Sequence, residues 1–128
     1  MLLGEMQGPC PWGLLLVKDS ESKEEIPTWA SDEEQVAFAA TALVVRVLHQ
    51  DEGDVLVRAW DDNNDVRGGL TFSGEIDLPS SLLQVSDALG EQFVEIAVPT
   101  VRQHIEVYTN AVREASEVHL VLSDTNTA

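Results

Sequence analysis

Five consecutive polar residues in the middle of the chain carry the most suggestive chemistry of the sequence. Asp61, Asn63 and Asp65 place oxygen ligands at the first, third and fifth positions of a calcium-binding loop. The rest of such a loop is absent, because Val66 replaces the glycine of its sharp turn and Phe72 replaces its bidentate glutamate. We therefore expect either an irregular calcium site or an ordinary polar loop between two strands.

A second candidate site combines two arginines with a tryptophan. Residues 43–49 and 54–60 are rich in β-branched residues, and the glycine-containing segment between them predicts a hairpin. In that hairpin Arg46 lies opposite Arg58, with an exposed Trp60 on the same face. The three side chains would form a small recognition patch, with a carboxylate or a bound anion between the two like charges.

Catalytic chemistry has little support in the sequence. Cys10 lies in a proline-rich stretch with no base beside it, and the sequence contains neither a Gly-x-Ser-x-Gly motif nor a phosphate-binding glycine loop. His104 and His119 could share one face of a sheet and hold zinc, although solvated histidines are the simpler interpretation. We expect a protein with no enzymatic activity and no cofactor.

The net charge limits the partners that this protein can bind. Its 128 residues include 23 acidic and 7 basic side chains, for a formal net charge of -16. Such a charge repels nucleic-acid phosphates and anionic lipid headgroups, and it attracts basic protein surfaces. Plain solubility is the alternative explanation. We expect a protein partner, with no binding to nucleic acid or to membranes.

The pattern of apolar residues predicts one domain over residues 1–128 that is mainly β. Eight short apolar runs separated by turn signals are predicted strands, at 13–17, 43–48, 54–60, 70–78, 82–85, 93–98, 104–108 and 117–122. About eight such strands are typical of an antiparallel β-sandwich or a flattened barrel. We expect residues 1–12 to be irregular and residues 123–128 to form a disordered tail.

Two segments leave the choice between helix and strand open. A capping box at Ser31–Glu34 is compatible with one short helix in 31–42. In 99–117, helical spacing of apolar residues after Pro99 competes with frequent β-branched residues, and we prefer a strand followed by a loop.

The single cysteine and the length of the apolar runs indicate the cellular compartment of the protein. Cys10 has no second cysteine with which to form an internal disulfide, which favours a reducing environment. The first residues do not resemble a signal peptide, and the apolar runs are too short to span a bilayer. We expect a cytoplasmic protein, whose oligomeric state the sequence leaves open.

Short motifs over most of the chain resemble those of a known family. They begin with Trp29–Glu33, Gln35 and Phe38-Ala39 before a valine-rich strand. They continue through Asp54–Arg58, Phe72–Ile76, Val98-Pro99 and Ile105–Tyr108, so that about 29–122 is covered. The first motifs are similar to the competence protein J family of nuclease inhibitors, except that Ala37-Phe38 replaces its usual Gly-Phe, and the later ones are similar to uncharacterised bacterial β-proteins. The resemblance implies a compact, acidic, β-rich inhibitor of a nuclease, and it implies no particular site residue.

These observations favour a non-enzymatic interaction protein of the inhibitor or immunity type. Its acidic surface would bind a basic partner such as a nuclease or a toxin. The alternative is a small-ligand or calcium-dependent binding module on a β-sandwich, built from 61–65 and the aromatic face near Trp60. The salt dependence of binding distinguishes the two functions, because electrostatic steering of a protein partner weakens with ionic strength and binding of a neutral ligand does not.

Overall fold

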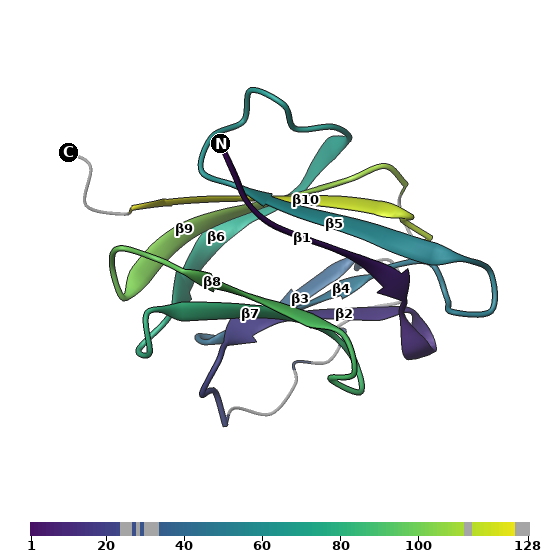
Figure 1. The fold of residues 1–128 in the computed structure, drawn as a ribbon, viewed down its shortest axis with the longest axis horizontal. Helices are drawn as coiled ribbons and strands as arrows, with labels where there is room; N and C mark the ends of the chain where they lie inside the picture. The colour runs from purple at the N-terminus through teal and green to yellow at the C-terminus, as the bar shows by residue number, and fades with distance from the viewer. Residues whose placement is uncertain (24–26, 28, 30–33, 112–113, 125–128) are drawn as a thin grey trace.

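The structure is a computed structural model that describes residues 1–23, 27, 29, 34–111 and 114–124, which form two β-sheets facing each other (Figure 1). Sheet A consists, in spatial order, of β1 (Leu2–Pro9), β5 (Asp54–Trp60), β10 (Glu117–Asp124), β9 (Arg102–Thr109) and β6 (Gly69–Asp77). Sheet B consists of β3 (Val36–Phe38), β4 (Ala42–Arg46), β2 (Leu14–Asp19), β7 (Leu82–Asp87) and β8 (Phe93–Ala97). The predicted mainly β sandwich is confirmed, with ten strands in the described residues.

Strand β10 is the exception to the antiparallel pairing of the described strands. It lies between β5 and β9, and it runs parallel to β5 and antiparallel to β9. In this register His119 lies opposite Arg58 on one side and opposite Tyr108 on the other. The last strand of the chain therefore occupies the centre of sheet A rather than an edge.

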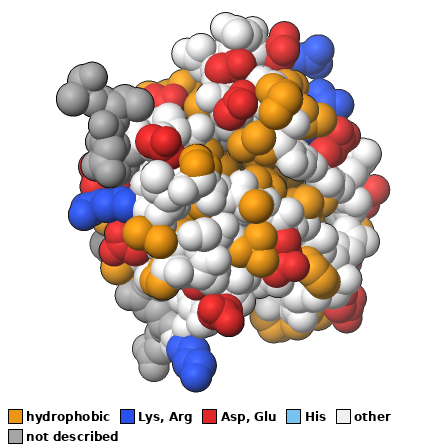
Figure 2. Space-filling model, turned by 60° about the vertical axis from the view of Figure 1, so that its left-hand side comes forward, with side chains coloured by type: hydrophobic (Ala, Val, Ile, Leu, Met, Phe, Trp, Pro, Cys, Tyr) orange, Lys and Arg blue, Asp and Glu red, His pale blue; other side chains and the backbone are white. Residues whose placement is uncertain are grey.

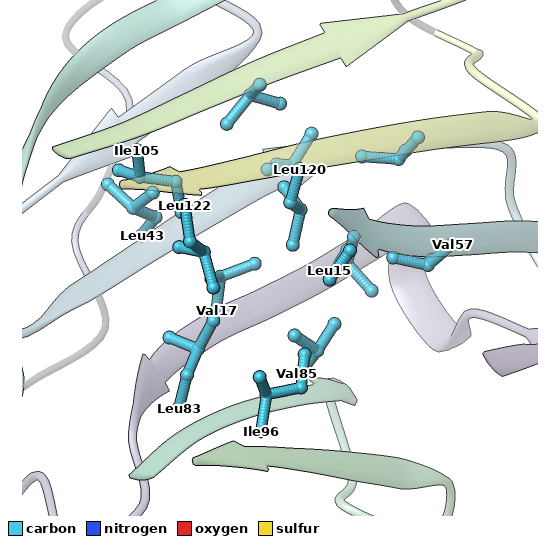
Figure 3. Close-up of a cluster of buried hydrophobic side chains, with 14 of the residues drawn as sticks. Leu15, Val17, Leu43, Val57, Leu83, Val85, Ile96, Ile105, Leu120 and Leu122 are labelled. Atoms are coloured by element: carbon cyan, nitrogen blue, oxygen red, sulfur yellow. The ribbon is translucent and has the colours of Figure 1, made fainter. Parts of the chain in front are cut away.

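One apolar core lies between the sheets. Successive side chains of a strand point to opposite faces, so every second residue of each strand turns inward. Leu15 and Leu83 from sheet B and Ile105 and Leu120 from sheet A point into the same space and are fully buried (Figure 3). Each such side chain contributes about 1.5–3 kcal/mol when it leaves water.

The two sheets also meet along their sides. Gly4 of β1 lies against β8, where an added Cβ would come within 3.2 Å of side-chain atoms of Val94 and Ile96. On the other side, Phe38 of β3 packs on Phe72 of β6, with ring centroids 5.1 Å apart. The absence of a side chain at Gly4 thus lets the two edge strands approach each other.

The expected hairpin between 43–49 and 54–60 is wrong. Both segments are strands, but β4 belongs to sheet B and β5 to sheet A. After β4, the Val47 N–H donates to the Gly13 carbonyl and the Leu48 N–H donates to the Ala115 carbonyl, both at 2.9 Å, as the chain crosses between the sheets. Placing the strands in opposite sheets turns Leu43 and Val45 of β4 and Val55 and Val57 of β5 toward the same core.

The two segments that were open between helix and strand are β where they are described. Strands β3 and β4 contradict a helix over 31–42, although residues 31–33 of the capping box lie outside the described residues. Strand β9 confirms a strand followed by a loop in 99–117, apart from 112–113, which also lie outside. In the described part of the chain, the one helical turn is the 3-10 turn Pro11–Gly13, and no helix there could cross a membrane.

The expectation for the amino terminus is wrong, and that for the tail is wrong in part. Residues 2–9 form β1, paired with β5, instead of an irregular start. Gly4 and Gly8 occupy inward positions of β1, where an amphipathic strand normally has apolar side chains. The alternation of apolar and polar residues is therefore interrupted in the sequence. Ser123 and Asp124 belong to β10, whereas 125–128 lie outside the described residues.

Truncating the core from either sheet tests whether the two layers fold as one unit. We expect Leu83→Ala and Ile105→Ala each to lower the free energy of unfolding by about 2–5 kcal/mol, because each leaves a cavity at a fully buried site. Both should shift one cooperative transition in denaturant titrations. Val101→Ala, at a side chain that is 56% exposed, is the control. Two separate transitions, each sensitive to one variant, would contradict a shared core.

Candidate interaction surface

Trp60 is buried and does not form a recognition patch. It is 8% exposed on the outer face of sheet A, and its indole N–H donates to Nδ1 of His119 at 2.9 Å. Because an indole nitrogen is a donor only, Nδ1 must accept and the imidazole proton lies on Nε2. That N–H donates to the Glu117 carboxylate at 2.6 Å. The three side chains form one hydrogen-bonded chain, and the expectation of an exposed Trp60 is wrong.

The two arginines of the expected patch lie on different sheets. Arg58 on β5 is 3.7 Å from the Glu5 carboxylate of β1, but this carboxylate does not lie between two arginines, because Arg46 belongs to the other sheet. Arg46 on β4 lies over the ring of Trp29, 4.3 Å from its centroid. Trp29 also packs on an apolar cluster on the outer face of sheet B. The structure therefore does not bring Arg46, Arg58 and Trp60 together.

The loop proposed for calcium follows β5 and turns two carboxylates toward the amino terminus. The Met1 ammonium lies 2.6 Å from Asp61 and 2.9 Å from Asp62, and this contact lowers the pKa of Asp62. Asn63 and Asp65 also lie in this loop, and Asp65 is exposed. Calcium binding by Asp61, Asn63 and Asp65 stays a prediction. Among the described residues, no three His, Cys, Asp or Glu side chains cluster as a metal site.

The histidines do not share a zinc-like arrangement. His104 is opposite Ser123, whereas His119 is opposite Tyr108, and each has its own hydrogen-bond partner. His104 is bonded to the Ser73 hydroxyl at 3.1 Å, and His119 belongs to the chain with Trp60.

The Cys10 thiol is held in its neutral form. It is fully buried, and burial raises its pKa to about 11, with Asp87 and Asp54 adding to the shift. A thiol in that state is a poor nucleophile at neutral pH.

An exposed apolar and acidic surface lies on the hairpin β7–β8, which sequence reasoning did not single out. On β8, Val94 and Ile96 point to the core, so Phe93 and Glu95 point outward. Phe93 is 54% exposed, and Leu89 in the hairpin loop is 52% exposed. We call Leu89, Glu91, Phe93 and Glu95 the β8 patch. The alternation of apolar residues in 93–98 already implies that Phe93 faces outward, so the exposed position of Phe93 could have been predicted from the sequence.

A buried carboxylate holds the loop of the β8 patch in place. Asp87 is 2% exposed and accepts three backbone N–H groups, from Leu89 at 2.9 Å and from Glu91 and Gln92 at 3.1 Å. A carboxylate that receives several N–H groups is well stabilised, and the loop that supplies them loses its freedom. The exposed Leu89 side chain is therefore presented from an ordered backbone.

Phe93 lies at the exposed end of a row of side chains that crosses the outer face of sheet B and is apolar except for Ser86. Ala37, Val44 and Leu16 form a buried cluster on its outer face, and Ser86 and Phe93 follow them in register toward the β8 edge. The row is buried as far as Ser86 and exposed at Phe93. Figure 2 shows one face of the molecule, on which apolar and acidic side chains are interspersed and Lys and Arg lie at the margins.

Comparisons with known proteins identify the fold. No protein-family model and no curated protein matches the sequence. The solved structure of ComJ from Bacillus subtilis, an inhibitor of the DNA-degrading activity of NucA, matches with a TM-score of 0.74 at 8% identity, covering 95% of this chain and 96% of ComJ. A protein described as crocagin biosynthetic gene J matches with a TM-score of 0.62 at 14% identity and the same coverage. The chain therefore has the ComJ fold that the sequence resemblance implied.

The hydrogen bond between His119 and Glu117 predicts a pH dependence of stability. This bond lowers the pKa of Glu117 below its ordinary value of 4.5, and Arg67 and Arg58 act in the same direction. A lowered folded-state pKa gives stability that is present above 4.5 and lost as the pH falls through the folded value. In urea titrations from pH 7 to pH 3, we expect the stability advantage of wild type over Glu117→Gln to shrink below about pH 4.5. Parallel curves for the two proteins would contradict this, and Glu52→Gln, on the exposed turn, is the control.

Replacing Asp87 tests the ordering of the loop. In Asp87→Asn an NH₂ group replaces one carboxylate oxygen, so at least one backbone N–H of the loop loses its acceptor. We expect a loss of about 1–3 kcal/mol and faster amide hydrogen exchange at Leu89, Glu91 and Gln92, with unchanged exchange in β10. Asp54→Asn, at an exposed carboxylate, is the matched control. Unchanged exchange in the loop would show that Asp87 does not order it.

Proposed function

We propose that this protein binds and inhibits a basic protein, most readily a nuclease, and that the β8 patch makes the contact. The observation that carries the proposal is the exposure of Leu89 and Phe93 beside Glu91 and Glu95 on a loop fastened by Asp87. The ComJ fold supports it, because a protein with this fold inhibits a DNA-degrading enzyme.

The apolar members of the β8 patch have the properties of binding anchors. Interfaces depend on a few large apolar side chains that become fully desolvated on contact. Leu89 and Phe93 are already half exposed to water, so their burial by a partner releases that surface. Because the loop is ordered before binding, little conformational entropy is lost on association.

The acidic members of the β8 patch give the contact its selectivity. A nuclease binds the phosphates of DNA in a basic groove, and carboxylates beside an apolar anchor complement that groove. The net charge of -16 attracts such a partner over a longer range and speeds encounter at low salt. The same charge keeps the protein from binding DNA itself, so inhibition would come from occupation of the enzyme.

The test measures degradation of plasmid DNA by a panel of basic endonucleases, NucA included, with increasing amounts of the protein. We expect one enzyme to be inhibited at a stoichiometric ratio, and inhibition by Phe93→Ala and Leu89→Ala to be weaker by about ten-fold or more. Glu91→Gln with Glu95→Gln should slow association and reduce its salt dependence. Stopped-flow or biosensor kinetics at two ionic strengths would measure this.

Matched variants elsewhere on the surface keep the test specific. Val101→Ala removes an equally exposed apolar side chain, and Glu52→Gln removes an exposed charge, so both should inhibit like the wild type. Thermal unfolding of each variant shows that the fold is retained. Equally strong inhibition by all variants would show that the contact lies outside the β8 patch. Failure to inhibit any endonuclease would overturn the nuclease proposal.

A further inference from the structure

The turn between β1 and β2 presents a tryptophan in a backbone conformation that tryptophan rarely adopts. Trp12 has a φ of 60°, in the left-handed region, and it is 66% exposed. A residue with a Cβ has an energetic cost in this region that glycine avoids, and burial of the indole does not offset that cost. Strained residues cluster at functional sites, so the exposed indole of Trp12 is a candidate contact for a partner.

Hydrogen bonds fix the backbone on both sides of Trp12. The Gly13 N–H donates to the Cys10 carbonyl at 3.0 Å, and the Gln50 N–H donates to the same carbonyl at 3.1 Å. The Val47 N–H donates to the Gly13 carbonyl at 2.9 Å, and Cys10 itself is fully buried. The indole is therefore presented from an ordered turn, and little backbone freedom is lost when a partner covers it.

This turn lies beside the loop of the β8 patch. Burial, and next the Asp87 carboxylate, raise the pKa of the Cys10 thiol, so the carboxylate that orders the loop is close to the turn. Before the turn, a side chain at Gly8 would overlap the side-chain amide of Gln92, the last residue of the loop. After the turn, Leu15 of β2 lies opposite Asp87. The indole and the β8 patch thus belong to neighbouring segments at one end of sheet B.

The segments that meet at this end are acidic. Residues 9–13, 49–51 and 87–92 include Asp51, Asp87 and Glu91, and they contain no lysine or arginine. The Asp51 side chain is 81% exposed, and its neighbour Gln50 is the residue bonded to the turn. Exposed apolar side chains beside carboxylates complement a basic protein. A second copy of this chain fits less well, because each copy has a net charge of -16.

We propose that Trp12 is an anchor of the same interface as the β8 patch, where it contacts the basic protein that this chain inhibits. The inference rests on the proposed function, and it adds a contact residue from outside the hairpin β7–β8. Tryptophan is enriched among the residues that dominate binding energy, because its large ring becomes fully desolvated in a complex. Its face also stacks well on arginine, which a basic partner supplies.

The test measures inhibition by Trp12→Gly of the endonuclease that the wild type inhibits. We expect inhibition to be weaker by about ten-fold or more, through faster dissociation. The melting temperature should stay equal or rise, because glycine relieves the left-handed strain. Weaker inhibition by an equally stable protein separates a contact role of Trp12 from a structural one. Phe38→Ala is the matched control and should inhibit like the wild type, because Phe38 is an aromatic residue that is 62% exposed on the opposite edge of sheet B.

Spectra of the wild-type protein test the contact without a substitution. When the inhibited endonuclease is added, the indole N–H signal of Trp12 in ¹H–¹⁵N spectra should shift together with the backbone signals of Leu89 and Glu91. The indole signal of Trp60 should stay in place, because Trp60 is buried and donates to His119.

Four outcomes would overturn the inference, and they are distinct. Full inhibition by Trp12→Gly, or an unchanged Trp12 indole signal in the complex, would overturn it and leave the proposed function intact. Weaker inhibition by Trp12→Gly with full inhibition by Phe93→Ala would contradict a shared interface. A wild-type dimer that Trp12→Gly converts to a monomer in sedimentation would show that a second copy covers the indole. Failure to inhibit any endonuclease would overturn this inference together with the proposed function.

Discussion

The apolar layer shared by the two sheets is the constraint on which the rest of this structure depends. Every strand must turn alternate side chains toward it, so the choice of sheet for a strand decides which of its residues face water. β4 and β5 are adjacent in sequence, and each turns apolar side chains into the shared layer from an opposite sheet. The same requirement turns Val94 and Ile96 of β8 inward and leaves Phe93 and Glu95 outside.

Two buried carboxylates hold turns that lie outside the apolar layer. Asp19 and Asp87 are each 2% exposed, so the acidic excess of this chain is not confined to its surface. Asp19 accepts the backbone N–H of Glu21 and both the N–H and the hydroxyl of Ser80, which joins the end of β2 to the turn before β7. Asp87 does the same within its own hairpin. Buried charge is tolerated at both positions because several donors satisfy it.

The features that suggest function gather at one end of sheet B. Leu15, near the start of β2, lies opposite Asp87, and Leu14 lies opposite Arg46, so the ordered hairpin loop lies at the end of sheet B where β2 begins. This loop combines an exposed apolar side chain with charged neighbours on a backbone held by hydrogen bonds. In sheet A, the polar groups of Trp60, His119 and Glu117 instead satisfy one another. The tryptophan that the sequence pattern placed on the surface is thus a structural residue.

The sequence by itself determined the fold class and eight of the strand positions, because apolar alternation and turn residues are local properties of the chain. It also determined the net charge that favours a basic partner. β1 was missed because its inward positions include Gly4 and Gly8, which break the apolar alternation. A side chain at either position would meet β8 or Gln92, which are distant in sequence. Strand partners, the burial of Trp60 and the separation of Arg46 from Arg58 were decided by the tertiary structure. Pairing depends on which apolar faces meet across the core, and that is a property of the whole chain rather than of any segment.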